Sequence, residues 1–124
     1  MGRHSEIHEL EREIARCEEE LRILESKEHI IRRLQAEIAD EVETPVKSYD
    51  VTLADGFRGA LESNAEDMQS QIYSETRRAQ DHTSEFLSEM ARARERIREH
   101  IEKCQRRIDH LWAEIEAESR SNAM

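Results

Sequence analysis

The chain has 124 residues, a formal charge of −10, and 39% charged against 36% hydrophobic residues, a composition that excludes a thick globular core. With 4% aromatic residues and a single proline, it excludes a typical sheet protein and is typical of long helices or a coiled coil. The acidic balance argues against unaided binding to nucleic acid or anionic lipid, because both depend on Lys and Arg.

The first predicted element is a helix over residues 5–43. Ser5 is suited to cap its first turn, and Thr44-Pro45 is expected to end it, because the residue before a proline is disfavoured in the helical region. Apolar residues recur every three or four positions, as in a coiled-coil seam, and only Glu28 and Gln35 interrupt them. This seam comprises Ile7, Leu10, Ile14, Cys17, Leu21, Leu24, Ile31, Ile38 and Val42.

A connector over residues 44–56 and a longer second helix over residues 57–118 follow. The second helical pattern contains no proline, and residues 119–124 are small and polar enough to predict a disordered tail. Its seam comprises Leu61, Ala65, Met68, Ile72, Ala79, Phe86, Met90, Ala93, Ile97, Ile101, Cys104, Ile108, Leu111 and Ile115.

The two seams match when the helices run antiparallel, which predicts an all-α fold: a single coiled-coil-like two-helix hairpin over residues 1–120. The start of the second helix then has no partner on the first. We expect the partly extended connector to pack there through Val46, Tyr49, Val51 and Leu53. The register pairs Leu10 with Leu111, Ile14 with Ile108 and Cys17 with Cys104, and places Gln35 opposite Phe86.

The turn into the second helix, Asp55 to Gly59, holds two of the three glycines of the chain on either side of Phe57. We expect Asp55 to cap the helix, Phe57 to plug the tip of the hairpin, and Gly59 to let the backbone approach closely. The alternative is a merely flexible turn, although flexibility alone does not require the phenylalanine.

At this turn, Phe57-Arg58-Gly59 resembles the Trp-x-Gly motif of the WXG-type helical-hairpin proteins of type VII (Esx) secretion. The long connector and unequal helices are most similar to the small companions encoded beside LXG-type toxins in Gram-positive bacteria. The resemblance covers most of the chain in architecture and two residues in motif. It implies a non-enzymatic protein without cofactors, which pairs as a helical bundle and helps to deliver a secreted substrate to the secretion ATPase.

The export signal of that family, Tyr-x-x-x-Asp/Glu after the second helix, has no match here. Tyr73 is followed four residues later by Arg77, and Trp112 with Glu116 has the spacing but the wrong aromatic residue. The chain also lacks the charged-then-apolar start of a cleavable signal. We therefore expect a cytoplasmic targeting or chaperone role, or export through the type VII system as a passenger on a partner.

Two other functions stay open. A prefoldin-like chaperone subunit also has two long antiparallel helices, but that family places β-hairpins between them, whereas residues 56–72 read as helix here. The second is a structural coiled-coil adaptor.

Apolar residues outside the seam suggest a surface for a helical partner, either a second copy or another protein. Ile30, Leu34 and Leu87 are expected to lie at one level of the hairpin. Trp112 and the tip residues Phe57 and Gly59 complete the predicted contact residues. The alternative is that these side chains simply widen the seam.

Cys17 and Cys104 are expected in one layer, as a disulfide that clamps the hairpin or as two buried thiols, and a cytosolic origin favours thiols. His100 lies one turn before Cys104, but the expected register brings no third and fourth ligand to them, so we expect no metal site. The sequence has no nucleophile elbow, phosphate loop or triad, so we expect no enzyme activity.

Overall fold

A computed structural model of the chain describes residues 2–50 and 59–123, and all regular structure in this part is helical. The elements are α1 (Arg3–Ile38), a π-helical turn η1 (Ala39–Glu43), α2 (Thr44–Ser48) and α3 (Ala60–Ala123). The fold is an all-α helical hairpin, which confirms the predicted class. The helices α1 and α3 are long because charged residues with high helix propensity occupy most positions outside the seam.

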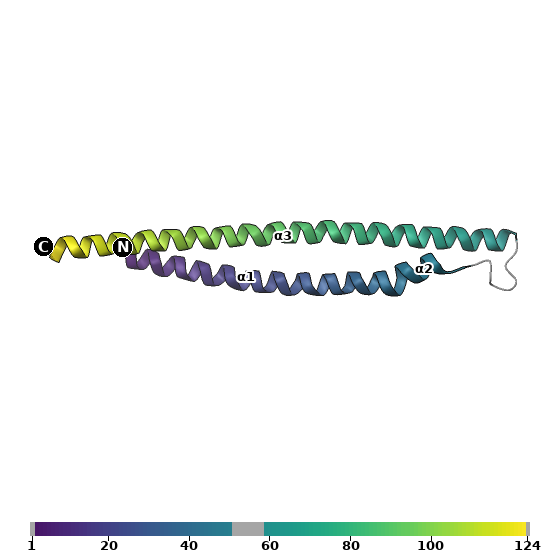
Figure 1. The fold of residues 1–124 in the computed structure, drawn as a ribbon, viewed down its shortest axis with the longest axis horizontal. Helices are drawn as coiled ribbons and strands as arrows, with labels where there is room; N and C mark the ends of the chain where they lie inside the picture. Colours follow the sequence, from purple (N-terminus) through teal and green to yellow (C-terminus); the bar gives the residue numbers. More distant parts are fainter. Residues whose placement is uncertain (1, 51–58, 124) are drawn as a thin grey trace. The chain divides into compact units, whose positions relative to one another are not determined.

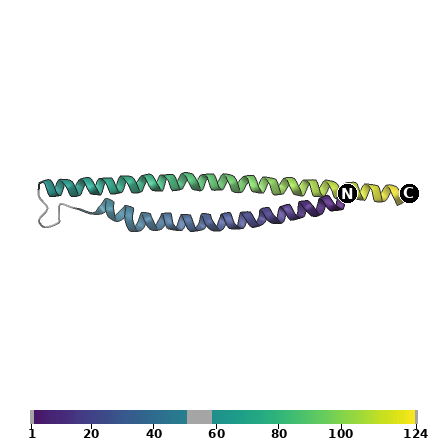
Figure 2. The same ribbon diagram turned by 180° about the vertical axis from the view of Figure 1, so that it is seen from behind.

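The chain divides into two compact units. Met1–Lys27 and Met90–Met124 form the terminal unit, and Glu28–Glu89 forms the middle unit. Within each unit, a segment of α1 runs antiparallel to a segment of α3 (Figures 1 and 2). Each unit therefore has its own seam.

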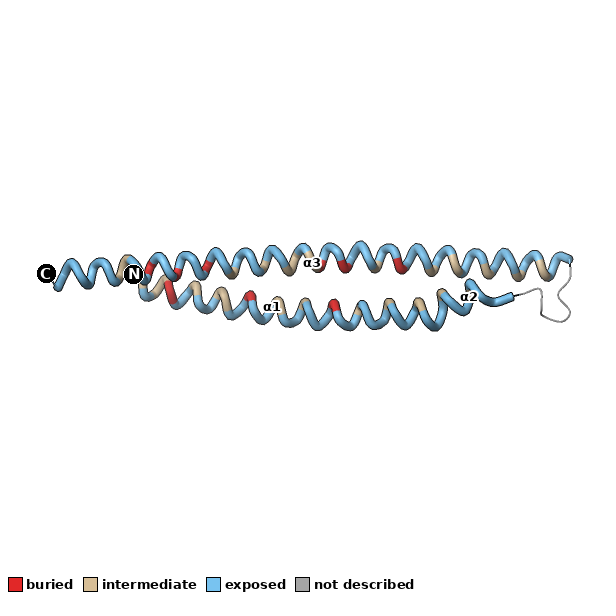
Figure 3. Tube along the Cα trace, viewed as in Figure 1, coloured by how far each residue is buried: buried red, intermediate tan, exposed pale blue. Residues whose placement is uncertain are grey.

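The seam of the terminal unit is apolar. Ile7, Ile108 and Leu111 are buried together, and Leu10, Ile14 and Ile115 pack against them. The predicted seam residues of this unit thus lie together in one cluster. Figure 3 shows the buried positions on the sides of α1 and α3 that face each other.

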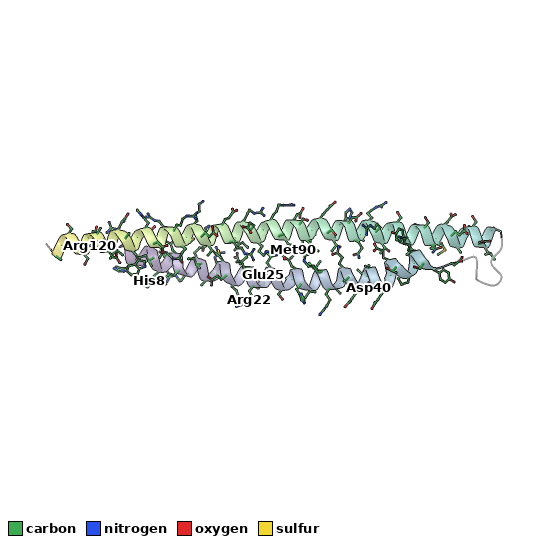
Figure 4. The ribbon with its side chains drawn as sticks, in the orientation of Figure 1. His8, Arg22, Glu25, Asp40, Met90 and Arg120 are labelled. Atoms are coloured by element: carbon green, nitrogen blue, oxygen red, sulfur yellow. The ribbon has the colours of Figure 1, made fainter. Side chains whose placement is uncertain are left out.

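Ion pairs along the rim of the terminal unit also join α1 to α3 in antiparallel order. Arg3 contacts Glu114 at 2.7 Å and Glu118 at 2.6 Å, and Arg107 contacts Glu6 at 3.0 Å. Long polar side chains cover the outer sides of both helices (Figure 4). Exposed pairs of this kind contribute little individually, so the apolar cluster carries the stability of the unit.

Arg3 lowers the pKa of Glu114, chiefly through their hydrogen bond. A carboxylate with a lowered folded-state pKa stabilises the fold above its unfolded pKa, and this stabilisation is lost as pH falls through the folded pKa. We expect Arg3→Ala to return the Glu114 pKa toward its ordinary value and to weaken the acid side of the pH–stability curve. NMR titration of the Glu114 carboxyl checks this, with Arg12→Ala as control. An unchanged Glu114 pKa in Arg3→Ala would contradict the assignment.

The seam of the middle unit is partly polar. The side-chain amide of Gln35 donates to the backbone carbonyl of Gln80 at 3.2 Å and to Ser84 Oγ at 2.8 Å. In return, the side-chain amide of Gln80 donates to the backbone carbonyl of Gln35 at 2.8 Å. Gln80 and Glu28 are buried there. Reciprocal amide bonds specify register, but they bury little apolar area.

The helical backbone continues past the predicted end at residue 43, so the expectation that Thr44-Pro45 ends the helix is wrong. Pro45 lies in the first turn of α2, where a missing N–H costs nothing. Upstream, the Thr44 N–H donates to the Ala39 carbonyl, five residues back. This wider turn leaves room for the proline ring, which otherwise clashes with the carbonyl four residues before it.

The connector and tail also differ from prediction. The predicted 44–56 connector is helical up to Ser48, and residues 119–123 continue α3 instead of forming a disordered tail. Phe57, Asp55, Val51 and Leu53 lie outside the described residues. Gly59 precedes α3 with φ +58°, and no described atom lies within 4 Å of a Cβ added there. Its left-handed backbone favours glycine at this position.

Candidate functional site

The structure separates the predicted partner-contact residues. Ile30 and Leu34 are exposed, as expected for residues outside the seam, and Trp112 is 44% exposed with its ring edge-on to His4 at 5.5 Å. Leu87 is 4% exposed, so its prediction as a surface contact is wrong. The neighbouring Phe86, predicted to face Gln35 in the seam, is 51% exposed.

The exchange of Phe86 and Leu87 reflects a one-residue shift of the seam along the middle unit. On α3 the side chains turned inward include Gln69, Tyr73, Gln80 and Leu87, whereas the predicted Met68, Ile72, Ala79 and Phe86 are exposed; the predicted Ala65 stays half-buried. A shift of one residue rotates a helix face by about 100°. The apolar residues predicted to fill this seam therefore lie beside it.

A similar one-residue shift of the inward face occurs on the first arm of the hairpin, in η1 and α2. From Ala39 onward, the half-buried positions are Ala39, Glu43 and Val46, whereas Ile38 and Val42 are exposed. The π-helical turn contributes to it, because its extra residue moves the inward side forward by one position.

The displaced residues form a set that we call the apolar face. Its members are between 38% and 62% exposed. The apolar face comprises Ile30, Leu34, Ile38, Val42, Tyr49, Leu61, Met68, Ile72 and Phe86.

The two helices present these residues on one side of the middle unit. Ile30, Leu34, Ile38 and Val42 each directly precede a half-buried residue of α1 or η1, and Leu61, Met68, Ile72 and Phe86 each precede an inward residue of α3. Both stripes are thus turned from the seam in the same rotational sense. For antiparallel helices, equal rotation places both stripes on the same face of the pair.

A groove of about 430 Å³ lies on this face, between α2 and the first turns of α3. Pro45, Val46 and Tyr49 line one side, and Ala65, Met68 and Ile72 line the other. The Gln69 amide donates to the carbonyls of Val46 and Tyr49 at 2.6 Å each, and so fixes the two walls. Val46 and Tyr49 thus lie beside the start of α3, as predicted, but they face Met68 and Ile72 across an open groove, and Tyr49 is 59% exposed.

The negative charge of the chain is concentrated in the segment that forms the middle unit. Residues 28–89 contain fourteen Asp and Glu against six Lys and Arg, a formal charge of −8, whereas all other residues together carry −2. Beside the α3 stripe, Asp67, Glu75, Glu85 and Glu89 are exposed, with Arg78 among them. The apolar face thus has an acidic rim.

The terminal unit holds a second cluster that sequence analysis missed. Glu13, Cys17 and His100 each place one potential ligand atom within 4.8 Å of the other two. Cys104 Sγ lies 3.7 Å from His100 Nε2, and both cysteines are buried free thiols. The expectation that no further ligands converge on His100 is wrong, because Glu13 and Cys17 reach it from α1.

The charged neighbours of this cluster act on its protonation. The Arg16 guanidinium lowers the pKa of the Glu13 carboxyl by hydrogen bonding to it, and His100 adds to the effect. Burial raises the pKa of the Cys17 thiol, and the nearby Glu13 carboxylate raises it further. At neutral pH, and with no cation bound, the Glu13 carboxyl is therefore ionised and the Cys17 thiol is protonated.

Among the described residues, no helix combines the length and apolar character that crossing a membrane requires. No protein-family model matches the chain, and no curated protein or solved structure matches it.

Proposed function

We propose that this chain is a non-enzymatic helical binding protein, and that the apolar face of the middle unit docks an amphipathic helix of a partner protein. The observation that carries the proposal is the mismatch between seam and surface in this unit. Its seam holds Gln35, Gln80 and Glu28, while nine large apolar or aromatic side chains stand at least 38% exposed outside it. Contiguous exposed apolar side chains with a polar rim are typical of protein-binding surfaces.

The acidic rim favours a basic helix over a second copy of this chain. Two copies joined through this face would bring two regions of −8 charge together, which opposes association. A helix with Lys and Arg beside its apolar stripe complements both the apolar side chains of the face and its acidic rim. We therefore expect a heteromeric complex, and we expect light scattering of the protein alone to give the 14.6 kDa of a monomer.

The resemblance to type VII secretion companions names a concrete partner. On this proposal the chain acts in the cytoplasm as a targeting chaperone, and the docked helix belongs to a secreted substrate such as the N-terminal domain of an LXG-type toxin. The proposal rests on the two-helix architecture and on Gly59 of the Phe-x-Gly turn. Co-expression with the helical domain encoded by each adjacent gene tests it, and failure to form a complex with any of them would count against this identity of the partner.

Charge substitution on the groove tests the surface itself. We expect the double variant Met68→Glu/Ile72→Glu to weaken partner binding by at least about tenfold, because it places two charges where apolar area must be buried. Both side chains are exposed, so the free protein keeps its fold. Calorimetric titration of the complex measures the change.

Ile23→Glu is the matched control, because Ile23 is 50% exposed on α1 in the terminal unit. It should bind as the parent protein does. Equal weakening by the control, or unchanged binding by the double variant, would place the partner elsewhere. Rising salt should also weaken binding, since the acidic rim contributes through charge.

A further inference from the structure

Four side chains with metal-binding atoms meet in the terminal unit. Glu13 and Cys17 lie four residues apart on α1, and His100 and Cys104 lie four residues apart on α3. Residues four apart share one face of a helix, so each helix presents a ready pair of ligands. Because the helices are antiparallel, the two pairs meet across the seam.

Three of these atoms lie at distances close to those of a tetrahedral ligand set. Zn²⁺ binds sulfur at about 2.3 Å and nitrogen or oxygen at about 2.1 Å, which puts neighbouring ligands roughly 3.4–3.8 Å apart in a tetrahedron. Here Glu13 Oε1 lies 3.2 Å from His100 Nε2 and 3.8 Å from Cys17 Sγ, and all three atoms lie within 4.8 Å of one another. Cys104 Sγ lies 3.7 Å from His100 Nε2 but outside this group of three, so completing the set requires its movement toward Glu13 and Cys17.

We propose that Glu13, Cys17, His100 and Cys104 form a binding site for Zn²⁺ that joins α1 to α3 in the terminal unit. Two thiolates, an imidazole and one carboxylate favour zinc over calcium or magnesium, which prefer sites built entirely of oxygen. Four protein ligands leave no open position, so the site is structural and not catalytic.

The surroundings balance the charge of this site. Two thiolates and a carboxylate around Zn²⁺ leave one negative charge in excess, and the Arg16 guanidinium lies beside it. Arg16 Nε donates to Glu13 Oε2 at 3.2 Å, which orients the carboxylate and leaves Oε1 directed at His100. Arg16 Nη2 also contacts Oε1, and this bond is exchanged for the metal. Outer partners of this kind position metal ligands.

The ion has a path to the site. A cavity of about 330 Å³ opens beside Glu13, Cys17 and His100. The His100 side chain is 50% exposed, whereas both sulfur atoms belong to buried residues. On binding, each thiol releases one proton to solvent, and no electron is transferred.

Cobalt titration of the reduced full-length chain tests the proposal. We expect Co²⁺ to give a thiolate-to-cobalt charge-transfer band and the strong visible bands of tetrahedral cobalt, at one ion per chain, and Zn²⁺ to abolish both. Zn²⁺ at about 100 times its Kd should also raise the Tm by at least about 5 °C, because the ion binds only the folded arrangement.

Variants separate this site from non-specific binding. We expect Cys17→Ser and His100→Ala each to weaken Zn²⁺ binding by at least about 100-fold, with loss of the charge-transfer intensity of one sulfur in Cys17→Ser. His100→Ala removes a half-exposed side chain, so circular dichroism should show an unchanged fold. His82→Ala, at an exposed histidine of the middle unit, should bind as the parent does.

Three results would overturn the proposal: no charge-transfer band with the reduced protein, a stoichiometry that His100→Ala leaves unchanged, or octahedral cobalt spectra. If the purified chain instead contains a Cys17–Cys104 disulfide that persists at the redox potential of the cytoplasm, the two sulfur ligands are lost and the proposal fails. Partner docking through the apolar face does not depend on this outcome.

Discussion

Leu87→Ala is expected to lower the free energy of unfolding by about 2–5 kcal/mol, the range for a buried leucine truncated to alanine. Phe86→Ala removes a larger side chain, yet it should cost less than about 1 kcal/mol. The reason is that Leu87 is 4% exposed whereas Phe86 is 51% exposed. Urea unfolding followed by circular dichroism measures both variants.

This pair of neighbours decides between the two seams available to the middle unit. If Phe86 lay inward opposite Gln35, as the apolar pattern alone predicts, the order of the two costs would be reversed. A larger loss for Phe86→Ala would therefore contradict the shifted seam, and with it the apolar face.

Leu111→Ala, in the terminal unit, is expected to lower the free energy of unfolding by about 2–5 kcal/mol, because it leaves a cavity in place of a buried leucine side chain. Leu111 is 1% exposed and lies with Ile7 and Ile108 in the cluster that joins α1 to α3. Only seven apolar side chains are buried in the described part of the chain, so one of them is a large share of a total of about 5–15 kcal/mol.

Trp112→Ala is the control for this variant, because Trp112 directly follows Leu111 and stands half exposed against His4. It should cost about 1 kcal/mol or less. Thermal unfolding followed at 222 nm reports both variants. If the two changes proved equally costly, Leu111 could not be the packed member of the pair.

The sequence predicts the terminal unit well and the middle unit poorly, for a physical reason. In the terminal unit the seam positions are apolar and most of their neighbours are polar, so the sequence indicates which face of each helix is buried. Ile7, Leu10, Ile14, Ile108 and Leu111 therefore identify the two faces that meet.

In the middle unit, adjacent positions compete for the seam. Phe86 and Leu87 are both apolar, and the inward position two turns earlier is held by Gln80 and not by Ala79. Hydrogen bonds from the side-chain amides of Gln35 and Gln80 to each other's backbone carbonyls determine which residues lie in the seam. The spacing of apolar residues contains no information about such bonds. For the same reason, apolar spacing could not indicate that the face beside the seam stays exposed.

The end of the first helix was predicted from a rule that permits exceptions. A proline usually ends a helix at the preceding residue, but it is tolerated in a first turn. The π-helical turn over Ala39–Glu43 makes Thr44-Pro45 the start of α2. The residue types in this turn do not indicate that it contains an extra residue.

The ligand cluster could have been found by searching for pairs of ligands four residues apart on both helices. Glu13 and Cys17 form such a pair on α1, and His100 and Cys104 form one on α3. On antiparallel helices, two such pairs meet when the first member of one faces the second member of the other. The predicted layer of Cys17 with Cys104 instead puts Glu13 and His100 on opposite sides of that layer, whereas the structure brings Glu13 Oε1 within 3.2 Å of His100 Nε2.

Hydrogen exchange of the full chain, alone and bound to its helical partner, tests docking on the apolar face most directly. We predict added protection in α2 and in the first turns of α3, residues 45–49 and 60–76, where the groove walls lie. Amides in residues 100–118 should exchange at the same rates in both samples. Protection confined to residues 100–118, with none added around Met68 and Ile72, would contradict the account.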